Sequence, residues 1–323
     1  MSESTAKDQV RAYVSDAHSI EVQALAQLRS APDLAGVESL AQALSHHLVE
    51  TEGHERLVRE RLDQLGETPS RMKDLLMAAG GKGFLLFARS QPDTPGKLAA
   101  HAYSYEHLEL ASYELLRRVA DAAGDDDTAA LATRIAGEER AMGERLAALF
   151  DQTTEASLAL ITSPPAEALK AYLSDAHAIE EQSIGLLERA CELAGDPGLA
   201  SPYEQHVEQS RRHQARVEAR LGAVGGAPSP IKDTAMHAGA INWATFFQAH
   251  PDTPGKVAAF AYAFEHLEIG GYEQLMRVAR AAGDEETAAM AKEILAEERD
   301  AAAMIAARWD AAAAASLEAV GAS

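Results

Sequence analysis

Residues 13–23 read YVSDAHSIEVQ and residues 172–182 read YLSDAHAIEEQ, so the second stretch repeats the first at an offset of 159 residues. The same offset relates PDTPGK at residues 92–97 to PDTPGK at residues 251–256. A repeat this long is a whole domain rather than a solenoid unit, which has roughly 20–50 residues. The sequence therefore predicts two similar domains in tandem. The predicted domains are residues 1–160 and residues 161–323.

Proline and glycine divide each copy into four long segments in which apolar residues recur with a helical period. No segment alternates between apolar and polar residues as a half-buried strand does. A shorter amphipathic piece, residues 72–89, lies between the second and third segments. We therefore expect an all-α protein of two tandem four-helix bundles, each with an extra short helix between helices two and three. In the first copy the expected helices span residues 6–30, 36–66, 95–123 and 126–156.

The composition of the 323 residues argues against several classes of protein. Lys and Arg number 29 against 50 Asp and Glu, and the net charge of −21 repels phosphate backbones and anionic lipids. The single cysteine, Cys191, has no partner for an intrachain disulfide, and no apolar run approaches the ~18 residues of a membrane-spanning helix. The polar start MSESTAKDQV does not resemble a secretory signal. We expect a cytoplasmic protein that binds neither nucleic acid nor membranes.

Each expected helix carries polar residues on its apolar stripe. Glu21 shares a face of the first helix with Ala17 and Ala24, because residues three or four apart lie together. The other helices follow the same pattern, and the copies differ at one of these positions, where Gln209 replaces Glu50. The polar residues are Glu21, His47, Glu50, His54, Glu106, Glu109, Tyr113, Glu138 and Glu139, then Glu180, His206, Gln209, His213, Glu265, Glu268, Tyr272, Glu297 and Glu298.

Burying several ionised carboxylates is costly unless a cation or hydrogen bonds compensate for their charge. A bound pair of divalent metal ions is one compensation, and bundle cores hold such pairs. The alternative is that these acids are partly exposed or paired with arginines, because arginines recur at the repeat offset as faithfully as the acids. Both interpretations stay open, and Glu109 and Glu139 are expected to be solvated or bridging rather than metal ligands. The recurrent arginines are Arg61 and Arg220, Arg118 and Arg277, and Arg140 and Arg299.

Four motifs, one on each expected helix of the first copy, carry a family resemblance. They are DAHSIEVQAL at residues 16–25, HLVETEGH at residues 47–54, YEHLELASY at residues 105–113 and EER at residues 138–140. Together they resemble the YciF-type bacterial stress-associated group of ferritin-like proteins, and the resemblance covers essentially all of both copies. It implies two tandem ferritin-like four-helix bundles with a dinuclear iron or manganese site between the helices.

The chain departs from the ferritin-like pattern at the metal ligands. Such sites carry Glu-x-x-His on two helices, but Thr51 stands three residues before His54, and the same spacing fails in the second copy. No histidine follows Glu138 at that spacing on the fourth helix. Each bundle then offers three carboxylates and one imidazole, and Glu50 is a further candidate in the first copy.

Two classes of function follow from these residues. The first is a carboxylate-bundle protein that binds iron or manganese at a one-metal or two-metal site for oxidative-stress or metal handling, with Tyr113 hydrogen-bonded to a ligand. The second is a non-catalytic ferritin-like scaffold that acts by protein interaction or assembly in a stress response. Whether the protein is an enzyme stays open. The expected metal ligands are Glu21, Glu50, His54, Glu106 and Glu138, then Glu180, His213, Glu265 and Glu297.

The gapless repeat also predicts an assembly. Two similar bundles joined by a few residues are expected to pack as a pseudo-symmetric pair, like the homodimer of a single-copy relative. Residues 92–97 recur unchanged and are assigned to this contact, because they look too exposed to serve a core. Further association into a homo-oligomer stays open.

Overall fold

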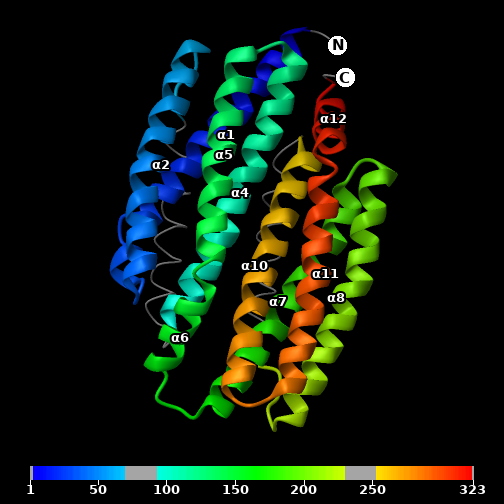
Figure 1. Ribbon diagram of the computed structural model, residues 1–323. Helices are drawn as coiled ribbons and strands as arrows, with labels where there is room; N and C mark the ends of the chain where they lie inside the picture. Colours follow the sequence, from blue (N-terminus) through cyan, green and yellow to red (C-terminus); the bar gives the residue numbers. More distant parts are fainter. Residues whose placement is uncertain (1–2, 70–92, 230–251, 322–323) are drawn as a thin grey trace. The chain divides into compact units, whose positions relative to one another are not determined.

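The structure, a computed structural model, describes residues 3–69, 93–229 and 252–321, and each regular element in these ranges is a helix (Figure 1). The prediction of an all-α chain built as two similar helical bundles is confirmed. The helices are α1 (Glu3–Leu28), η1 (Pro32–Leu34), α2 (Glu38–Gln64), α4 (Thr94–Ala123), α5 (Asp126–Ala147), α6 (Phe150–Leu160), α7 (Pro165–Leu193), α8 (Pro197–Ala223), α10 (Thr253–Ala281), α11 (Glu285–Ala306) and α12 (Trp309–Ala319).

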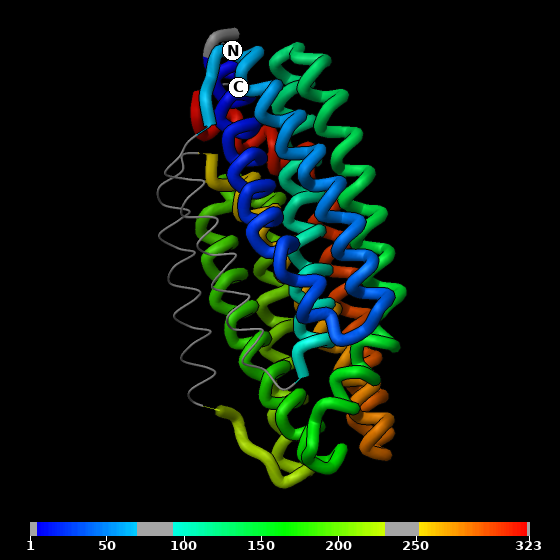
Figure 2. Tube along the Cα trace, turned by 90° about the vertical axis from the view of Figure 1, so that its left-hand side faces the viewer, coloured from blue at the N-terminus to red at the C-terminus, as the bar shows by residue number. Residues whose placement is uncertain are grey.

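Each compact unit is built around four long helices. The main segments of the two units are Met1–Ser157 and Leu158–Ala319. In the first unit α1 and α5 each pack against both α2 and α4, and in the second unit α7 and α11 each pack against both α8 and α10. At 1.5 Å per residue, the 30 residues of α4 form a rod of about 45 Å. Figure 2 traces rods of this kind side by side within each unit.

An apolar stripe on α5 faces the interior of the first bundle. Ile135, Met142 and Leu146 on α5 are fully buried. Side chains of this size each contribute about 1.5–3 kcal/mol when they leave water. The packing of such stripes, rather than helix propensity, therefore holds the four helices together.

The turn between α4 and α5 shows why these helices end where they do. Gly124 has a φ of 68° and ends α4 in the left-handed region that favours glycine. Asp125 then accepts a hydrogen bond from the backbone amide of Thr128 and caps α5. Arg61 near the end of α2 reaches Asp125 at 2.5 Å and ties three helices together. The second unit repeats these contacts with Gly283, Asp284, Thr287 and Arg220.

The described part of segment 92–97 serves the core of its own unit. Pro95 and Gly96 at the start of α4 are buried. The Ser157 hydroxyl accepts a hydrogen bond from the Gly96 amide at 2.8 Å and donates one to the Asp93 carbonyl at 3.0 Å. The second unit repeats both bonds. The assignment of this segment to an exposed contact surface is wrong, because its recurrence is explained by packing within each unit.

The helix expected over residues 126–156 is two helices. α5 ends at Ala147 and α6 begins at Phe150, although neither proline nor glycine separates them. Phe150 is buried, and its ring centroid lies 5.4 Å from that of Tyr103 on α4. Because α6 also carries Ser157, tertiary contacts redirect the chain where local sequence does not.

The extra short helix expected in each bundle, at residues 72–89 in the first copy, lies outside the described residues. Within the described ranges, none of the helices is both long enough and apolar enough to cross a membrane.

Candidate metal centres

In the middle of each bundle, polar side chains occupy positions on the same helix faces as the apolar core residues. On α2, His47, Thr51 and His54 are buried, and they continue a series that includes Leu44 and Val58. Positions three and four residues apart share one face of a helix. The two histidines therefore point into the bundle for the same reason as the aliphatic residues before and after them.

One group in the first bundle combines an imidazole with three carboxylates. His47, Glu106, Glu109 and Glu139 are buried, and each offers one ligand atom within 4.8 Å of the others. His47 Nε2 lies 3.0 Å from Glu106 Oε2 and 3.3 Å from Glu139 Oε2. Glu106 and Glu109 stand one helical turn apart on α4, so both carboxylates reach the same space. Oxygen and imidazole ligands of this kind suit iron, manganese or zinc.

A second group in the same bundle contains Glu21, His54 and Glu139. His54 Nδ1 lies 2.8 Å from Glu139 Oε1 and 3.9 Å from Glu21 Oε1. The hydroxyl of Tyr113 on α4 donates a hydrogen bond to Glu21 Oε1 and orients that carboxylate. Glu139 belongs to both groups and directs one oxygen toward each histidine.

The second bundle repeats both groups. His206 Nε2 lies 2.8 Å from Glu265 Oε2, and His213 Nδ1 lies 2.7 Å from Glu298 Oε1. The ligand types match those of the first bundle position by position. The groups are His206, Glu265, Glu268 and Glu298, and Glu180, His213 and Glu298.

Most of the atoms that face into these groups lack hydrogen-bond partners. Both carboxylate oxygens of Glu109 and both of Glu139 are buried without one. His47 Nε2 and Glu106 Oε2 lie 3.0 Å apart, yet neither makes an aligned hydrogen bond. Unsatisfied buried groups are rare in folded proteins, and a missing ion is one explanation for them. The remaining such atoms in the groups are Glu21 Oε2, His54 Nδ1, Glu180 Oε2, His206 Nε2, His213 Nδ1, Glu265 Oε2, Glu268 Oε1 and both oxygens of Glu298.

Carboxylates hold the other nitrogen of each histidine in the first bundle. Glu50 Oε2 lies 3.0 Å from His47 Nδ1, and Glu138 Oε2 lies 2.7 Å from His54 Nε2. Such a contact fixes the ring and its tautomer and makes the opposite nitrogen a better metal ligand. The side chains of Glu50 and Glu138 are 25% and 33% exposed. They lie behind the histidines, in the sense that each contacts the ring nitrogen that faces away from the buried carboxylates.

Burial sets the protonation of the carboxylates. It raises the pKa of Glu21 to about 8 and that of Glu106 to about 7, and it raises the pKa of Glu109 well above its usual range. Burial also opposes ionisation of Glu139, but the two facing histidines outweigh it and lower the pKa of Glu139 to about 2. A cluster without metal therefore takes up protons in place of a compensating cation.

The recurrent arginines pair with other acids. Arg61 contacts Asp125, and Arg118 and Arg140 both contact Glu114. Within the described ranges, neither lysine nor arginine forms an ion pair with the buried carboxylates of the two groups. The arginine network considered from the sequence does not compensate for these acids. The equivalent pairs join Arg220 to Asp284, and Arg277 and Arg299 to Glu273.

The structure places the sequence-derived candidates in two positions. Glu21, His54 and Glu106 lie within the groups, as do Glu180, His213 and Glu265. Glu50, Glu138 and Glu297 lie behind histidines. The sequence did not identify His47 as a ligand, and Glu109 and Glu139, expected to be solvated or bridging, are each 1% exposed. Each bundle thus assembles four carboxylates and two imidazoles, where three carboxylates and one imidazole were expected, with Glu50 as a further candidate in the first copy.

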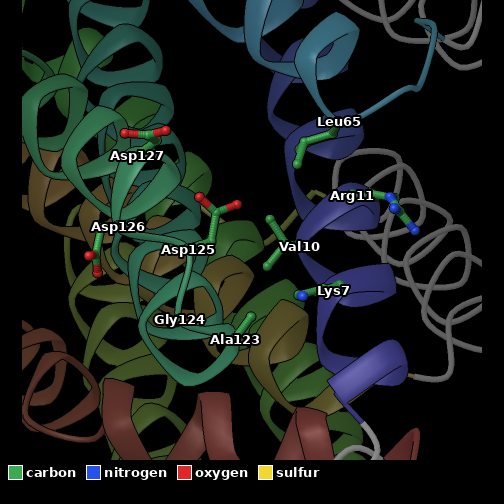
Figure 3. Close-up of a pocket in the computed structure, with 9 residues that line it drawn as sticks. All are labelled: Lys7, Val10, Arg11, Leu65, Ala123, Gly124, Asp125, Asp126 and Asp127. Carbon is green, nitrogen blue, oxygen red and sulfur yellow. The ribbon is translucent and has the colours of Figure 1, made fainter.

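A hollow of about 410 Å³ lies at one end of the first unit, between α1, the end of α2 and the α4–α5 turn (Figure 3). Asp125 in its wall already accepts hydrogen bonds from Arg61 and Thr128. None of the candidate ligands lines this hollow. Its lining residues are Lys7, Val10, Arg11, Leu65, Ala123, Gly124, Asp125, Asp126 and Asp127.

A comparison with protein families matches nearly the whole chain. The family described as a domain of unknown function (DUF892) matches residues 5–159 and again residues 165–318. No solved structure matches the chain. The two matched ranges coincide with the two copies of the repeat.

Proposed function

The chain belongs to the DUF892 family as two tandem copies, and we propose that each copy is a carboxylate-bundle metalloprotein that holds a pair of iron or manganese ions. The observation that carries this proposal is that six buried side chains converge in each bundle, and that most of their inward-facing atoms have no hydrogen-bond partner. The resemblance to YciF-type ferritin-like proteins supports it. The ligands of the first bundle are Glu21, His47, His54, Glu106, Glu109 and Glu139, and those of the second are Glu180, His206, His213, Glu265, Glu268 and Glu298.

The charge of each cluster supports two ions rather than one. Four carboxylates carry four negative charges when ionised, and two divalent cations balance them while both imidazoles stay neutral. Six ligands from four helices also match the number in di-metal carboxylate bundles, although the histidines there come from Glu-x-x-His motifs on two helices. Here both histidines come from α2, at residues 47 and 54, and the acids come from α1, α4 and α5.

The protein residues around such a pair have separable roles. Tyr113 orients Glu21, and Glu50 and Glu138 orient the two imidazoles. Burial excludes bulk water and strengthens every charge interaction inside the cluster. A bound iron or manganese pair supplies electron transfer to oxygen or peroxide, which suits a role in oxidative-stress or metal handling.

Elemental analysis of protein purified without chelator and loaded with iron or manganese tests the proposal. The four groups predict up to four ions per chain. The double substitution Glu139→Ala with Glu298→Ala removes the shared ligand of both bundles, and we expect its metal content to fall close to zero. Glu144→Gln, on the exposed side of α5, is the matched control and retains full content. Equal metal content in the parent and the double variant would favour the non-catalytic scaffold instead.

We further propose that the two copies associate as a pseudo-symmetric pair. The support is the gapless repeat, in which five residues separate the matched ranges 5–159 and 165–318. Small-angle scattering of the full chain is expected to fit one compact particle. A profile of two independently moving bodies on a tether contradicts this expectation.

A further inference from the structure

The two clusters differ in the residue behind one histidine. Glu50 Oε2 lies 3.0 Å from His47 Nδ1, and at the equivalent place Gln209 Oε1 lies 3.2 Å from His206 Nδ1. All six buried ligands, by contrast, are identical in type between the copies. One ligand histidine is therefore supported by a charged carboxylate and its counterpart by a neutral amide.

This exchange changes the strength of the histidine as a ligand. A carboxylate that accepts the Nδ1 proton pushes electron density toward Nε2, the atom that faces the carboxylates of the cluster. An amide oxygen accepts the same proton without a full negative charge. Glu50 also lies 3.3 Å from His46 Nδ1 and 3.9 Å from Arg145, but these partners are 65% and 40% exposed, so water screens them.

The amide of Gln209 also alters the support of the other histidine. Its Nε2 donates to Glu297 Oε2 at 2.6 Å, the same oxygen that lies 3.0 Å from His213 Nε2. That oxygen is shared between two donors, whereas Glu138 Oε2 faces His54 alone. Arg134 pairs with the other oxygen of Glu138, but the Arg134 side chain is 63% exposed, so water screens its charge.

A third difference lies among the buried carboxylates. The Ser183 hydroxyl donates to Glu268 Oε2 at 3.1 Å, whereas Ala24 stands at the equivalent position of the first copy. Glu268 is thus partly satisfied without metal, while both oxygens of Glu109 are unsatisfied. All three differences reduce the free energy that the second bundle gains when it binds a cation.

We propose that the two bundles bind divalent metal with unequal affinity, and that the first bundle is the tighter and fills first. The inference rests on the proposed function. Changes to groups that support metal ligands typically alter affinity by about 10–100-fold, so we expect a separation of that size. A chain with one retaining and one exchanging centre suits a protein that holds metal in one copy and releases it from the other.

A manganese titration of the full, metal-free chain tests the inference, with the free Mn²⁺ signal in electron paramagnetic resonance counting the unbound ion. The parent is expected to show two classes of two ions each. Glu50→Gln is expected to weaken the tight class and Gln209→Glu to strengthen the weak class, so each variant narrows the separation in affinity between the two classes. Glu52→Gln, exposed on the same helix, leaves both classes unchanged. Gln209→Glu places a charged carboxylate behind His206 and does not alter the first bundle. It therefore tests the inference even where Glu50→Gln disturbs folding.

Two further variants assign the classes to bundles. Glu139→Ala is expected to abolish the tight class and retain only the weak class. Glu298→Ala is expected to abolish the weak class and retain only the tight class. A single class in the parent overturns the inference and leaves the proposed function intact, as does a tight class that survives Glu139→Ala. Absence of Mn²⁺ binding in the parent contradicts the proposed function itself.

Discussion

Glu139 presents its two oxygens to two different imidazoles. Oε2 lies 3.3 Å from His47 Nε2, and Oε1 lies 2.8 Å from His54 Nδ1, while the ring centroids are 6.4 Å apart. Ions in paired metal sites stand about 3.5–4 Å apart, so Glu139 would be able to hold both ions of a pair through its two oxygens. The position of this single side chain therefore couples the two halves of the cluster.

Tyr113→Phe tests how far the orientation of one carboxylate matters. The substitution keeps the ring in the core and removes the donor to Glu21 Oε1. We expect the metal affinity of the first bundle to fall about 10–100-fold, and the free energy of unfolding of the metal-free protein to fall by about 1 kcal/mol. Equilibrium dialysis and urea denaturation measure the two effects. Tyr103→Phe, on the same helix but outside the groups, is the control; equal affinities in the two variants would contradict the orienting role.

The pH dependence of the metal-free protein is a second consequence at this scale. The folded-state pKa values of Glu21, raised by burial to about 8, and of His54, raised by Glu139 and Glu21 against burial to about 9, exceed the ordinary values of 4.5 and 6.5. The native state then binds more protons than the unfolded chain, and stability falls as pH rises wherever this holds. The stability from His54 is fully present below about pH 6.5 and is lost through about pH 9, and the penalty at Glu21 grows between about pH 4.5 and 8.

We therefore expect the melting temperature in excess chelator to fall by several degrees between pH 6 and pH 9. Scanning calorimetry at fixed ionic strength measures it. Glu21→Gln removes one titrating group and reduces the slope, whereas Glu144→Gln, exposed on α5, leaves it unchanged. A melting temperature that stays level or rises across this window rules out the protonated cluster.

Helix register was enough to place the two histidines of α2 in the interior of the bundle. Its buried positions include Leu40, Leu44, His47, Thr51 and His54, which follow one another at spacings of four, three, four and three. That is the spacing of a core-facing stripe. The sequence therefore specified both histidines as interior residues, but helix spacing alone does not distinguish a candidate ligand from another buried histidine.

The choice between neighbouring acids on α5 was also decided by register. Ala132, Glu139 and Met142 are buried on one stripe, and Glu138 lies one residue, or about 100° of rotation, from Glu139. Because the chain lacks Glu-x-x-His, the buried stripe rather than that motif indicates which of the two acids faces the interior. Register does not predict which ring nitrogen of each histidine faces the buried carboxylates, because that depends on how the separate helices pack.

Tertiary contacts explain the other departures from the sequence-based expectations. The break between α5 and α6 has no local signal and follows from the burial of Phe150. The recurrence of residues 92–97 is visible in the sequence, but whether it reflects a core or a surface depends on Ser157, which is 61 residues away from Gly96. Periodicity predicts a helix and its buried face, whereas long-range partners decide where the helix is interrupted.

Two equivalent glycines provide a test of packing at the helix entrances. Gly36 and Gly195 have φ values of 69° and 71°, but a Cβ at Gly36 would lie 2.4 Å from Pro95 Cγ, against 3.4 Å from Pro254 Cγ at Gly195. Gly195→Ala is expected to cost about 1–2 kcal/mol from the left-handed backbone alone. Gly36→Ala adds the clash and is expected to cost about 1–3 kcal/mol more. Denaturant unfolding measures both, and equal costs would show that α4 shifts freely at its start.

At the scale of the whole chain, acidity and metal binding are linked. The chain carries a net charge of −21, a count that includes the buried carboxylates of the clusters, and within the described ranges lysine and arginine do not pair with those carboxylates. Self-repulsion of this size weakens the compact state. If the clusters bind metal as proposed, a divalent cation stabilises the molecule in two ways, through general screening and through specific binding in the clusters.

The specific part can be isolated by measuring stability against free Mn²⁺ at constant ionic strength. A ligand that binds only the native state stabilises it by about 2.7 kcal/mol per site when its free concentration is 100 times its dissociation constant. We expect the melting temperature of the parent to rise with Mn²⁺ and to return on chelation. In Glu139→Ala with Glu298→Ala the rise is expected to vanish, because both clusters lose their shared ligand while the surface charge stays almost the same. An equal rise in parent and double variant would assign the whole effect to screening and remove the thermodynamic support for buried metal.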